Sequence, residues 1–277
     1  MRVHAAAVQL GYRPNLAARA LVTGRSGVVW FLAGSLASPT EHLPAEAAAR
    51  LCRDHGRDLL VATHHGDPAA HQRLLERLRQ GVADGAVIAA NQPDVDSPLL
   101  RELAASGFPL VFIDRHVPHI VAPVATTDHV GATLALMARL RAEGITHIAN
   151  LHLPVGNTVE VARYQALLAA VPAAGLTLVD HARPLPLRTA IVTSAWGHFS
   201  AWRRTHAALP VGTWICHYDY LMGDPPAGCT VLALEQDFVG MATAALELLN
   251  RRLEGQPASS EIRYLPLANL RVTRGTA

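Results

Sequence analysis

Two aspartates are the residues best placed to bind a small molecule. Asp114 ends the apolar run VFID, and Asp219 follows the apolar run WICHY. Both runs are typical of buried strands, and α/β proteins bind ligands at the carboxyl ends of their strands. Two carboxylates in such a place can accept paired hydrogen bonds from the hydroxyl groups of a sugar. The sequence therefore predicts a site for a small polar ligand.

The fifteen histidines raise the question of a metal site. The candidate clusters are His64-His65 with His71, His116 with His119, and Cys216-His217. A zinc site needs three or four ligands at defined spacing, and the chain has no HExxH or CxxC motif. We interpret the histidines as solvated or singly hydrogen-bonded, and expect no metal and no cofactor. GxSxG, GxGxxG and Walker motifs are also missing, so the sequence does not predict an enzyme.

The elements that must position the aspartates alternate along the chain from Gly27 onward. Predicted strands cover Gly27–Ala33, Asp58–Thr63, Gly85–Ala90, Pro109–Asp114, His147–Leu151, Thr189–Ser194 and Thr213–His217. Helical periodicity covers residues 68–82, with Asp67 as the N-cap, and residues 236–254, with Gly255 as the stop. Strands separated by single helices imply right-handed βαβ units. The number of elements favours an α/β fold with two doubly wound parallel-sheet lobes over one large sheet.

Length and composition limit the class of protein. The chain has 277 residues, of which 50% are hydrophobic and 17% charged, as in globular domains. No apolar run approaches the roughly 20 residues of a membrane span, and the N-terminus has no signal-peptide pattern. The three cysteines, Cys52, Cys216 and Cys229, form no CxxC pair and leave an odd thiol. We expect a cytoplasmic protein that does not associate with membranes.

The first 26 residues have a different character, because they carry four arginines and no carboxylate. Such a terminal segment is typical of an arm that lies against phosphates, although chance in an Arg-rich chain is the alternative. Asn15 is a suitable N-cap for a helix over Leu16–Val22, which Gly24 closes. A helix of about two turns is marginal in water by itself, so it needs a partner to be ordered.

The segment LGYRPNLAARALVTGRSG (Leu10–Gly27) resembles the one that joins the DNA-binding headpiece to the core in regulators of the LacI/GalR family. Further matching pieces are HGDP (65–68), DGAVI (84–88), FPLVFIDR (108–115), TTDHVGA (126–132), GITHIA (144–149), HYD (217–219), EQDF (235–238) and RVTRGT (271–276). The resemblance implies a two-lobed, periplasmic-binding-protein-like core. Its lobes would comprise residues 27–126 with about 235–262, and residues 127–234 with about 263–277, after a hinge segment over 1–26.

The resemblance also implies a function and a set of site residues. It implies a homodimeric repressor that binds operator DNA and responds to a small sugar-like effector. The effector-binding positions would be Asp114, Arg115, Asp219, Gln236 and Phe238. The DNA-binding positions would be Tyr12, Arg13, Asn15, Arg19, Leu21 and Arg25. Leu21 corresponds to the leucine that the family inserts into the minor groove, where an apolar wedge unstacks a base step.

Several departures from the family pattern concern the cleft. Ser38-Pro39-Thr40-Glu41 replaces an Asn-Pro-Phe-Phe run, and Ala195-Trp196 replaces Asn-Asp. Glu160 stands in place of a sugar-binding arginine, with Arg163 close by. Between Val179 and Ala190 the chain is shorter and is expected to lack a helix. These changes remove half of the polar clasp, which points to an unusual effector or a weakened response.

The chain begins inside the equivalent of the third headpiece helix, so the recognition helix is absent from this sequence. A gene start placed too late would explain this. The alternative is a headless effector-binding module without DNA recognition of its own. A sugar-processing enzyme on the same fold is a further alternative, for which no catalytic constellation is present.

Overall fold

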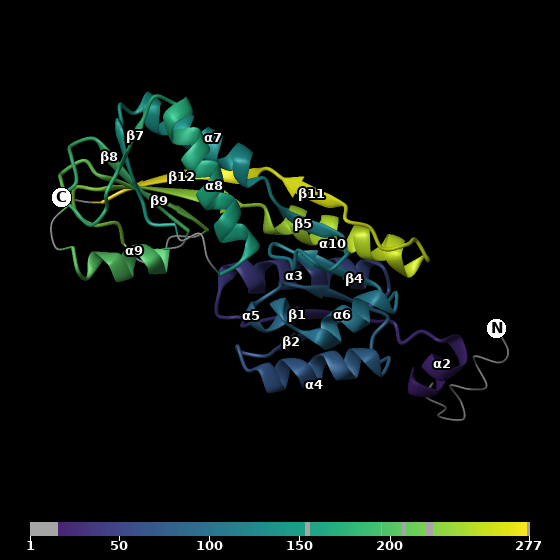
Figure 1. Ribbon diagram of the computed structural model, residues 1–277. Coiled ribbons are helices and arrows are strands. Elements are labelled where there is room, and N and C mark those ends of the chain that lie inside the picture. Colours follow the sequence, from purple (N-terminus) through teal and green to yellow (C-terminus); the bar gives the residue numbers. More distant parts are fainter. Residues whose placement is uncertain (1–15, 153–155, 195, 207–208, 220–223, 276–277) are drawn as a thin grey trace.

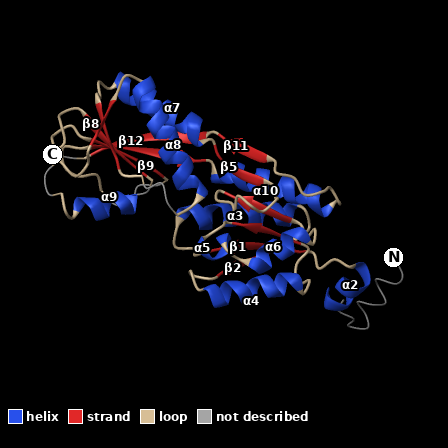
Figure 2. Ribbon diagram, viewed as in Figure 1, coloured by secondary structure: helices blue, strands red, loops and turns tan. Residues whose placement is uncertain are grey.

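The computed structural model describes residues 16–152, 156–194, 196–206, 209–219 and 224–275. These residues form two α/β lobes, each built on a six-stranded sheet (Figure 1). Figure 2 shows helices packed along the faces of both sheets. None of the described helices is both long and apolar enough to cross a membrane. Tyr12, Arg13 and Asn15 lie outside the described residues.

The first lobe contains a fully parallel sheet with the strand order β11-β5-β4-β3-β1-β2. Its strands are β1 (Val28–Ala33), β2 (Asp58–Thr63), β3 (Gly85–Ile88), β4 (Leu110–Ile113), β5 (Val124–Thr127) and β11 (Ile262–Leu265). One face packs against α3 (Pro39–Asp54) and α10 (Phe238–Leu253). The opposite face packs against α4 (Pro68–Arg79) and α6 (Pro98–Ala105), and α5 (Gln92–Val95) is a single short turn. The core of this lobe therefore has two apolar layers.

The second lobe has the strand order β12-β10-β9-β8-β6-β7, in which only β12 runs antiparallel. Its strands are β6 (His147–Asn150), β7 (Thr177–Val179), β8 (Thr189–Thr193), β9 (Trp214–Tyr218), β10 (Thr230–Gln236) and β12 (Leu267–Arg274). Helices α7 (His129–Ala142) and α8 (Thr158–Ala173) cover one face. The other face packs against α9 (Trp196–Arg203) and the loop over residues 180–188.

The chain crosses between the lobes three times. The first crossing joins β5 to α7 at Asp128, the second joins β10 to α10 at Asp237, and the third joins β11 to β12 at Pro266. The third crossing comes four residues later than the expected boundary near 262, because β11 still pairs with β5 of the first lobe. The carboxylates of both aspartates cap the helices that follow them.

All seven strands predicted from the sequence are present, with ends that shift by two residues at most. The predicted helix over 68–82 ends early, at Arg79, because Gly81 adopts a φ of +80° that an α-helix cannot continue. Val82 is consequently exposed rather than part of the buried helix face. Residues 180–188 contain no helix, in agreement with the shortened segment in the sequence.

The hinge segment contains one described helix, α2 (Leu16–Thr23), which ends at Gly24 as predicted. It lies at the end of the first lobe that is remote from the second lobe (Figure 1). The connection to the body is specific: the carboxylate of Asp84 accepts hydrogen bonds from the Ser26 hydroxyl and the Gly27 N–H, each at 2.9 Å. The chain directly after the helix is therefore tied to the first lobe.

Candidate functional site

Asp114 and Asp219 occupy equivalent positions, each directly after a central strand of its own lobe. Asp114 follows β4 with a φ of +61°, and Asp219 follows β9 with a φ of +71°. Left-handed backbone is uncommon for residues other than glycine and is often found at functional sites. Both side chains are buried, at 5% and 9% exposure. Each lobe thus contributes one of the two predicted strand-end carboxylates.

Electrostatic interactions across the cleft connect the two aspartates. Burial raises the pKa of Asp114, while the guanidinium groups of Arg115 and Arg163 counteract that rise. Burial also raises the pKa of Asp219, to about 6, against the lowering effects of Arg163 and of a hydrogen bond from Gln236. Arg163 belongs to α8 of the second lobe and acts on both carboxylates. The charged groups of the two lobes therefore interact with one another at this site.

In the first lobe, Arg115 organises the neighbours of Asp114. Its Nη1 donates a 2.9 Å hydrogen bond to Asn91 Oδ1, and its Nη2 forms an ion pair with the carboxylate of Glu41. Its Nε lies 3.5 Å from Asp114 Oδ2. Glu41 is itself buried on α3, where its Oε2 accepts a 2.6 Å hydrogen bond from the Ser35 N–H. Oδ1 of Asp114 is buried and has no hydrogen-bond partner among the described residues.

In the second lobe, the side chain of Arg163 is 5% exposed and fixed from three sides. Its guanidinium carbon lies 3.7 Å from the centre of the Tyr218 ring, a cation–π contact. Its Nε donates to His129 Nδ1, and its Nη1 to the Ser194 carbonyl, each at 3.4 Å. Burial and the adjacent Arg163 charge together hold the pKa of His129 well below its ordinary value. His129 is therefore neutral and can accept the hydrogen bond from Arg163.

Beside Arg163, a serine, a histidine and a glutamate are hydrogen-bonded to one another. The Ser194 hydroxyl lies 2.6 Å from His152 Nδ1 and donates to the carboxylate of Glu160. In a catalytic triad the carboxylate orients the histidine through the ring nitrogen that does not face the serine. Here Glu160 is 3.8 Å from the same Nδ1 that faces Ser194. The three side chains therefore do not have the relay geometry of a catalytic triad.

Gln236 links the aspartate of the second lobe to the first lobe. Its Nε2 donates to Asp219, and its Oε1 accepts a 2.7 Å hydrogen bond from the Thr127 hydroxyl at the end of β5. The register of β10 against β12 shifts between Glu235 and Gln236, a local irregularity of the kind that re-aims side chains. Phe238, in contrast, is 3% exposed and packs within the first-lobe core. Its assignment as a ring that stacks on the effector stays a prediction.

A cavity of about 500 Å³ opens between the lobes next to this cluster. Asn91 and His116 line it from the first lobe, and Thr158, Val161 and Gln165 line it from the second. The His116 N–H donates a 3.2 Å hydrogen bond to the Thr158 hydroxyl, which joins the two lobes directly. Asn91 contacts both the cavity and Arg115, so the cavity adjoins the charged cluster.

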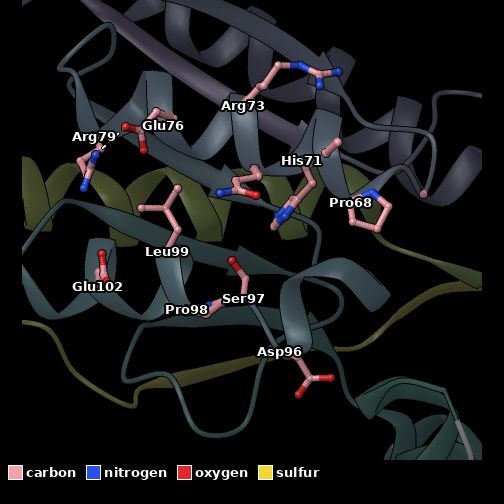
Figure 3. A pocket seen from close by; sticks show the side chains of 13 residues that line it. Pro68, His71, Arg73, Glu76, Arg79, Asp96, Ser97, Pro98, Leu99 and Glu102 are labelled. Carbon is pink, nitrogen blue, oxygen red and sulfur yellow. Dashed lines mark hydrogen bonds and ion pairs between the residues drawn. The ribbon is translucent and has the colours of Figure 1, made fainter.

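A groove of about 1170 Å³ lies outside the cleft, between α4 and α6 (Figure 3). His71 lines it, and His71 Nε2 bonds Asp94 Oδ1 at 2.7 Å with both side chains buried. The His64 ring lies 5.1 Å from the His71 ring. These two histidines are buried and hydrogen-bonded, His64 through the Gly66 N–H and His71 through Asp94, which fits the expectation of singly hydrogen-bonded side chains and not that of solvated ones. No group of three or more side chains that could hold a metal is found among the described residues.

The predicted DNA-binding residues are only partly described. Leu21 and Val22 on α2 are each 88% exposed. The guanidinium of Arg25 donates to the Leu253 carbonyl at the end of α10, at 3.4 Å. The side chain of Arg19 lies outside what the structure describes.

Sequence reasoning did not assign a role to several residues that complete the cluster. These are Glu41, Asn91, His129, His152, Ser194 and Tyr218. Most of them end a strand or lie one or two residues beyond its end. Collecting every polar residue at the carboxyl ends of the predicted strands would have found most of the set, because parallel strands bring those ends together.

The structure is a two-lobed α/β protein with a cavity between its lobes. Residues 45–187 match the family described as periplasmic binding proteins and sugar binding domain of the LacI family. The match covers more than half of the chain, and the chain belongs to this family.

Curated relatives and solved structures agree with this assignment. The HTH-type transcriptional regulators KdgR of Bacillus subtilis and PtxS of Pseudomonas plecoglossicida are 24% and 29% identical over 144 and 147 residues. These matches cover 52% and 53% of this chain, and they span 42% of each relative's length.

The fold resembles that of the Lac repressor dimer bound to operator and the anti-inducer ONPF, with a TM-score of 0.75 and 19% identity over 99% of this chain and 89% of that one. It also resembles Cra from Pseudomonas putida in complex with fructose 1-phosphate, with a TM-score of 0.68 and 19% identity over 91% of this chain and 99% of that one.

Proposed function

We propose that this chain is the effector-binding body of a transcription regulator, controlled by a small sugar-like molecule held between its lobes. The observation that carries the proposal is the pair of buried carboxylates, Asp114 from the first lobe and Asp219 from the second, coupled through Arg163. Carboxylates accept charge-assisted hydrogen bonds from ligand hydroxyls. The relatives named above are regulators, and Cra was solved with a sugar phosphate.

The position of the pair suggests how binding controls the regulator. A ligand that contacts both aspartates interacts most strongly when the lobes are close together, so it shifts the population toward the closed arrangement. The hinge segment leaves the first lobe at Ser26, where Asp84 fixes it. A change in lobe arrangement in one protomer of a dimer then alters the spacing of the two hinge helices.

The effector part of the proposal is tested by ligand-induced thermal stabilisation. Wild-type protein, Asp114→Asn and Asp219→Asn are screened against sugars and sugar phosphates, with Asp96→Asn as an exposed control outside the cleft. Loss of a charge-assisted bond should weaken binding by about 1.5–3 kcal/mol in each cleft variant. The proposal fails if no sugar stabilises the wild type, and the assignment of the pair fails if a ligand stabilises all four proteins equally.

We further propose that the protein is a homodimer that contacts DNA through α2. Leu21 and Val22 present apolar side chains to solvent on a helix of eight residues, which needs a partner for stability. A two-fold dimer matches a palindromic site. Sedimentation at micromolar concentration should give a dimer, and a monomer would contradict this proposal.

The DNA contact is tested with genomic fragments that the wild-type protein selects. Leu21→Ala should lower affinity for a selected fragment without changing its salt dependence, because it removes an apolar wedge. Arg25→Ala should reduce the salt slope by about one counterion, because it removes a phosphate contact. Leu187→Ala, also an exposed leucine, in the second lobe at 72% exposure, is the control and should leave both unchanged. Unchanged affinity in Leu21→Ala would contradict the wedge role.

A further inference from the structure

The polar cluster between the lobes carries more negative than positive groups. Among the described residues, four carboxylates, Glu41, Asp114, Glu160 and Asp219, interact with two guanidinium groups, Arg115 and Arg163. All six side chains are buried or half-buried. Isolated buried charges are costly unless they are paired, so the excess of carboxylates is a feature that needs a partner.

The neighbouring histidines do not supply the missing positive charge. Burial and the adjacent Arg163 guanidinium lower the pKa of His129. Burial is also the largest influence on His152, whose pKa is lowered despite its contact with Glu160. Both rings are therefore neutral near pH 7. Burial acts to raise the pKa of Glu160, but the hydrogen bond from Ser194 and the nearby His152 and Arg163 outweigh it, so the pKa is lowered and this group is ionised there.

Asp114 marks the position at which a partner is missing. Its Oδ2 lies near Arg115, but Oδ1 is buried without a hydrogen-bond partner among the described residues. The side chain is 5% exposed, so Oδ1 lies in the interior of the cleft and not at the surface. A buried acceptor without a donor costs about 1–3 kcal/mol, and more when it is charged. A ligand that donates a hydrogen bond from a charged group would remove this cost.

We propose that the effector carries a positive charge, as an amino sugar or aminated polyol whose ammonium group binds between Asp114 and Asp219. The inference rests on the proposed function, because it uses the same cleft, and it narrows the ligand class. An ammonium group offers three donors and one charge, which matches an unpartnered carboxylate better than a neutral hydroxyl does. The adjoining cavity of about 500 Å³ gives the remainder of such a ligand a place next to Asn91 and His116.

The test uses two pairs of compounds that differ only by an amine in place of a hydroxyl. Glucamine is compared with sorbitol, and glucosamine with glucose, by calorimetry at pH 7. The amine of at least one pair should bind tenfold or more tightly than its neutral partner. In Asp114→Asn that preference should fall to about twofold, whereas the exposed control Asp96→Asn should retain it.

The pH dependence of ligand affinity provides a second readout, which a change in the shape of the cleft alone would not produce. Asp219 faces Arg115, Arg163, Asp114 and Gln236, and it ionises with a pKa of about 6. Affinity for glucamine should therefore rise severalfold between pH 5 and pH 7, and by more than the affinity for a neutral sugar, which gains only a charge-assisted hydrogen bond when Asp219 ionises. Asp219→Asn should remove this rise.

The outcomes separate this inference from the proposed function. If neutral sugars bind and neither amine is preferred, the positive charge is overturned and the sugar-binding function is retained. If no compound in the wider sugar panel binds, the proposed function fails and the inference fails with it. If an amine is preferred but Asp114→Asn and Asp219→Asn keep the full preference, the location between the two aspartates is overturned.

Discussion

The two lobes have the same number of strands but are covered differently. The first-lobe sheet is enclosed by α3 and α10 on one face and by α4 and α6 on the other. The second-lobe sheet has two long helices, α7 and α8, on one face only. On its opposite face the eight-residue α9 and the loop over 180–188 replace the expected helical layer. Two sheets with the same number of strands are therefore covered by very different amounts of apolar packing.

The thinner face of the second lobe is held by aromatic contacts instead of helix–helix packing. The Trp196 and Phe199 rings lie 5.0 Å apart, and Trp202 stacks on His206 at 4.3 Å. The indole N–H of Trp202 donates a 3.2 Å hydrogen bond to the His181 carbonyl, which ties α9 to the loop. Because this layer has few buried contacts, it is the region in which local opening should require the least free energy.

The largest expected effect compares one buried phenylalanine from each lobe. Phe112→Ala, in β4, should lower the free energy of unfolding by about 4 kcal/mol, because its surroundings cannot collapse into the cavity. Phe199→Ala, in α9, should cost about 3 kcal/mol and leave the first lobe intact. Urea unfolding measures both costs. Amide hydrogen exchange should show α9 opening selectively in Phe199→Ala, and a larger cost there than in Phe112→Ala would contradict the comparison.

A second expectation concerns the tightly packed polar pair in the first lobe. Asp94 accepts hydrogen bonds from the His71 ring and the Asn91 N–H, both at 2.7 Å, and is 1% exposed. Asp94→Ala should lower the free energy of unfolding by about 3 kcal/mol, because it leaves buried donors without acceptors. Asp96→Ala, two residues away and exposed, should stay within about 0.5 kcal/mol in the same urea titration. Equal effects would show that the buried pair contributes nothing beyond the local backbone.

In the second lobe, the buried charge of Asp219 predicts a stability that depends on pH. Its pKa is raised from 3.8 to about 6 in the folded protein, so between these pH values the folded state binds more protons than the unfolded state. The free energy of unfolding should therefore fall as pH rises from 4 to 6, by roughly 2–3 kcal/mol from this group. Asp219→Asn should flatten that part of the profile. A profile with the same slope in both proteins would mean that Asp219 is not the group responsible.

Much of the fold could be predicted because the strands of a buried parallel sheet are continuous apolar runs in the sequence. The continuous apolar runs of β1, β3, β4, β8 and β9 are buried on both faces and were found from the sequence. Five of the described strands were missed. Three of them, β7, β11 and β12, have weaker local signals, and β5 has only four residues, whereas β10 is a buried apolar run that was not identified from the sequence. β11 and β12 alternate exposed and partly buried residues at the crossing between lobes, and β7 has only three residues at a sheet edge. Their pairing is set by the tertiary arrangement and not by local pattern.

The site could be predicted only in its outline. Asp114 and Asp219 were identifiable because each follows an apolar strand. The orientation of Arg163 was not, because it depends on the Tyr218 ring, which belongs to a different element of the chain. The burial of His64 and His71 was also hidden, since their sequence surroundings are polar and only the packed lobe encloses them.

The smallest expected effect concerns the aspartate helix caps, which occur in both lobes. Asp128 caps α7 by accepting the Gly131 N–H at 2.9 Å, and Asp237 caps α10 by accepting the Gly240 N–H at 2.8 Å. Both caps occur at crossings, within the repeated pattern Asp-x-Val-Gly. Asp128→Ala and Asp237→Ala should each lower the free energy of unfolding by about 1 kcal/mol, the usual cost of losing such a cap.

The corresponding asparagine variants test whether the cap itself carries this effect. Asparagine caps helices about as well as aspartate, so Asp128→Asn and Asp237→Asn should stay within a few tenths of a kcal/mol of the wild type in urea titrations. Both glycines lie so close to the capping carboxylate that an added methyl group would collide with it. Gly131→Ala and Gly240→Ala should therefore cost at least as much as removing the caps. The nearly equal hydrogen bonds of the two caps predict equal losses of unfolding free energy at the two crossings. A loss at one crossing twice that at the other would contradict this, and would mean that the difference in packing between the lobes extends to the crossings.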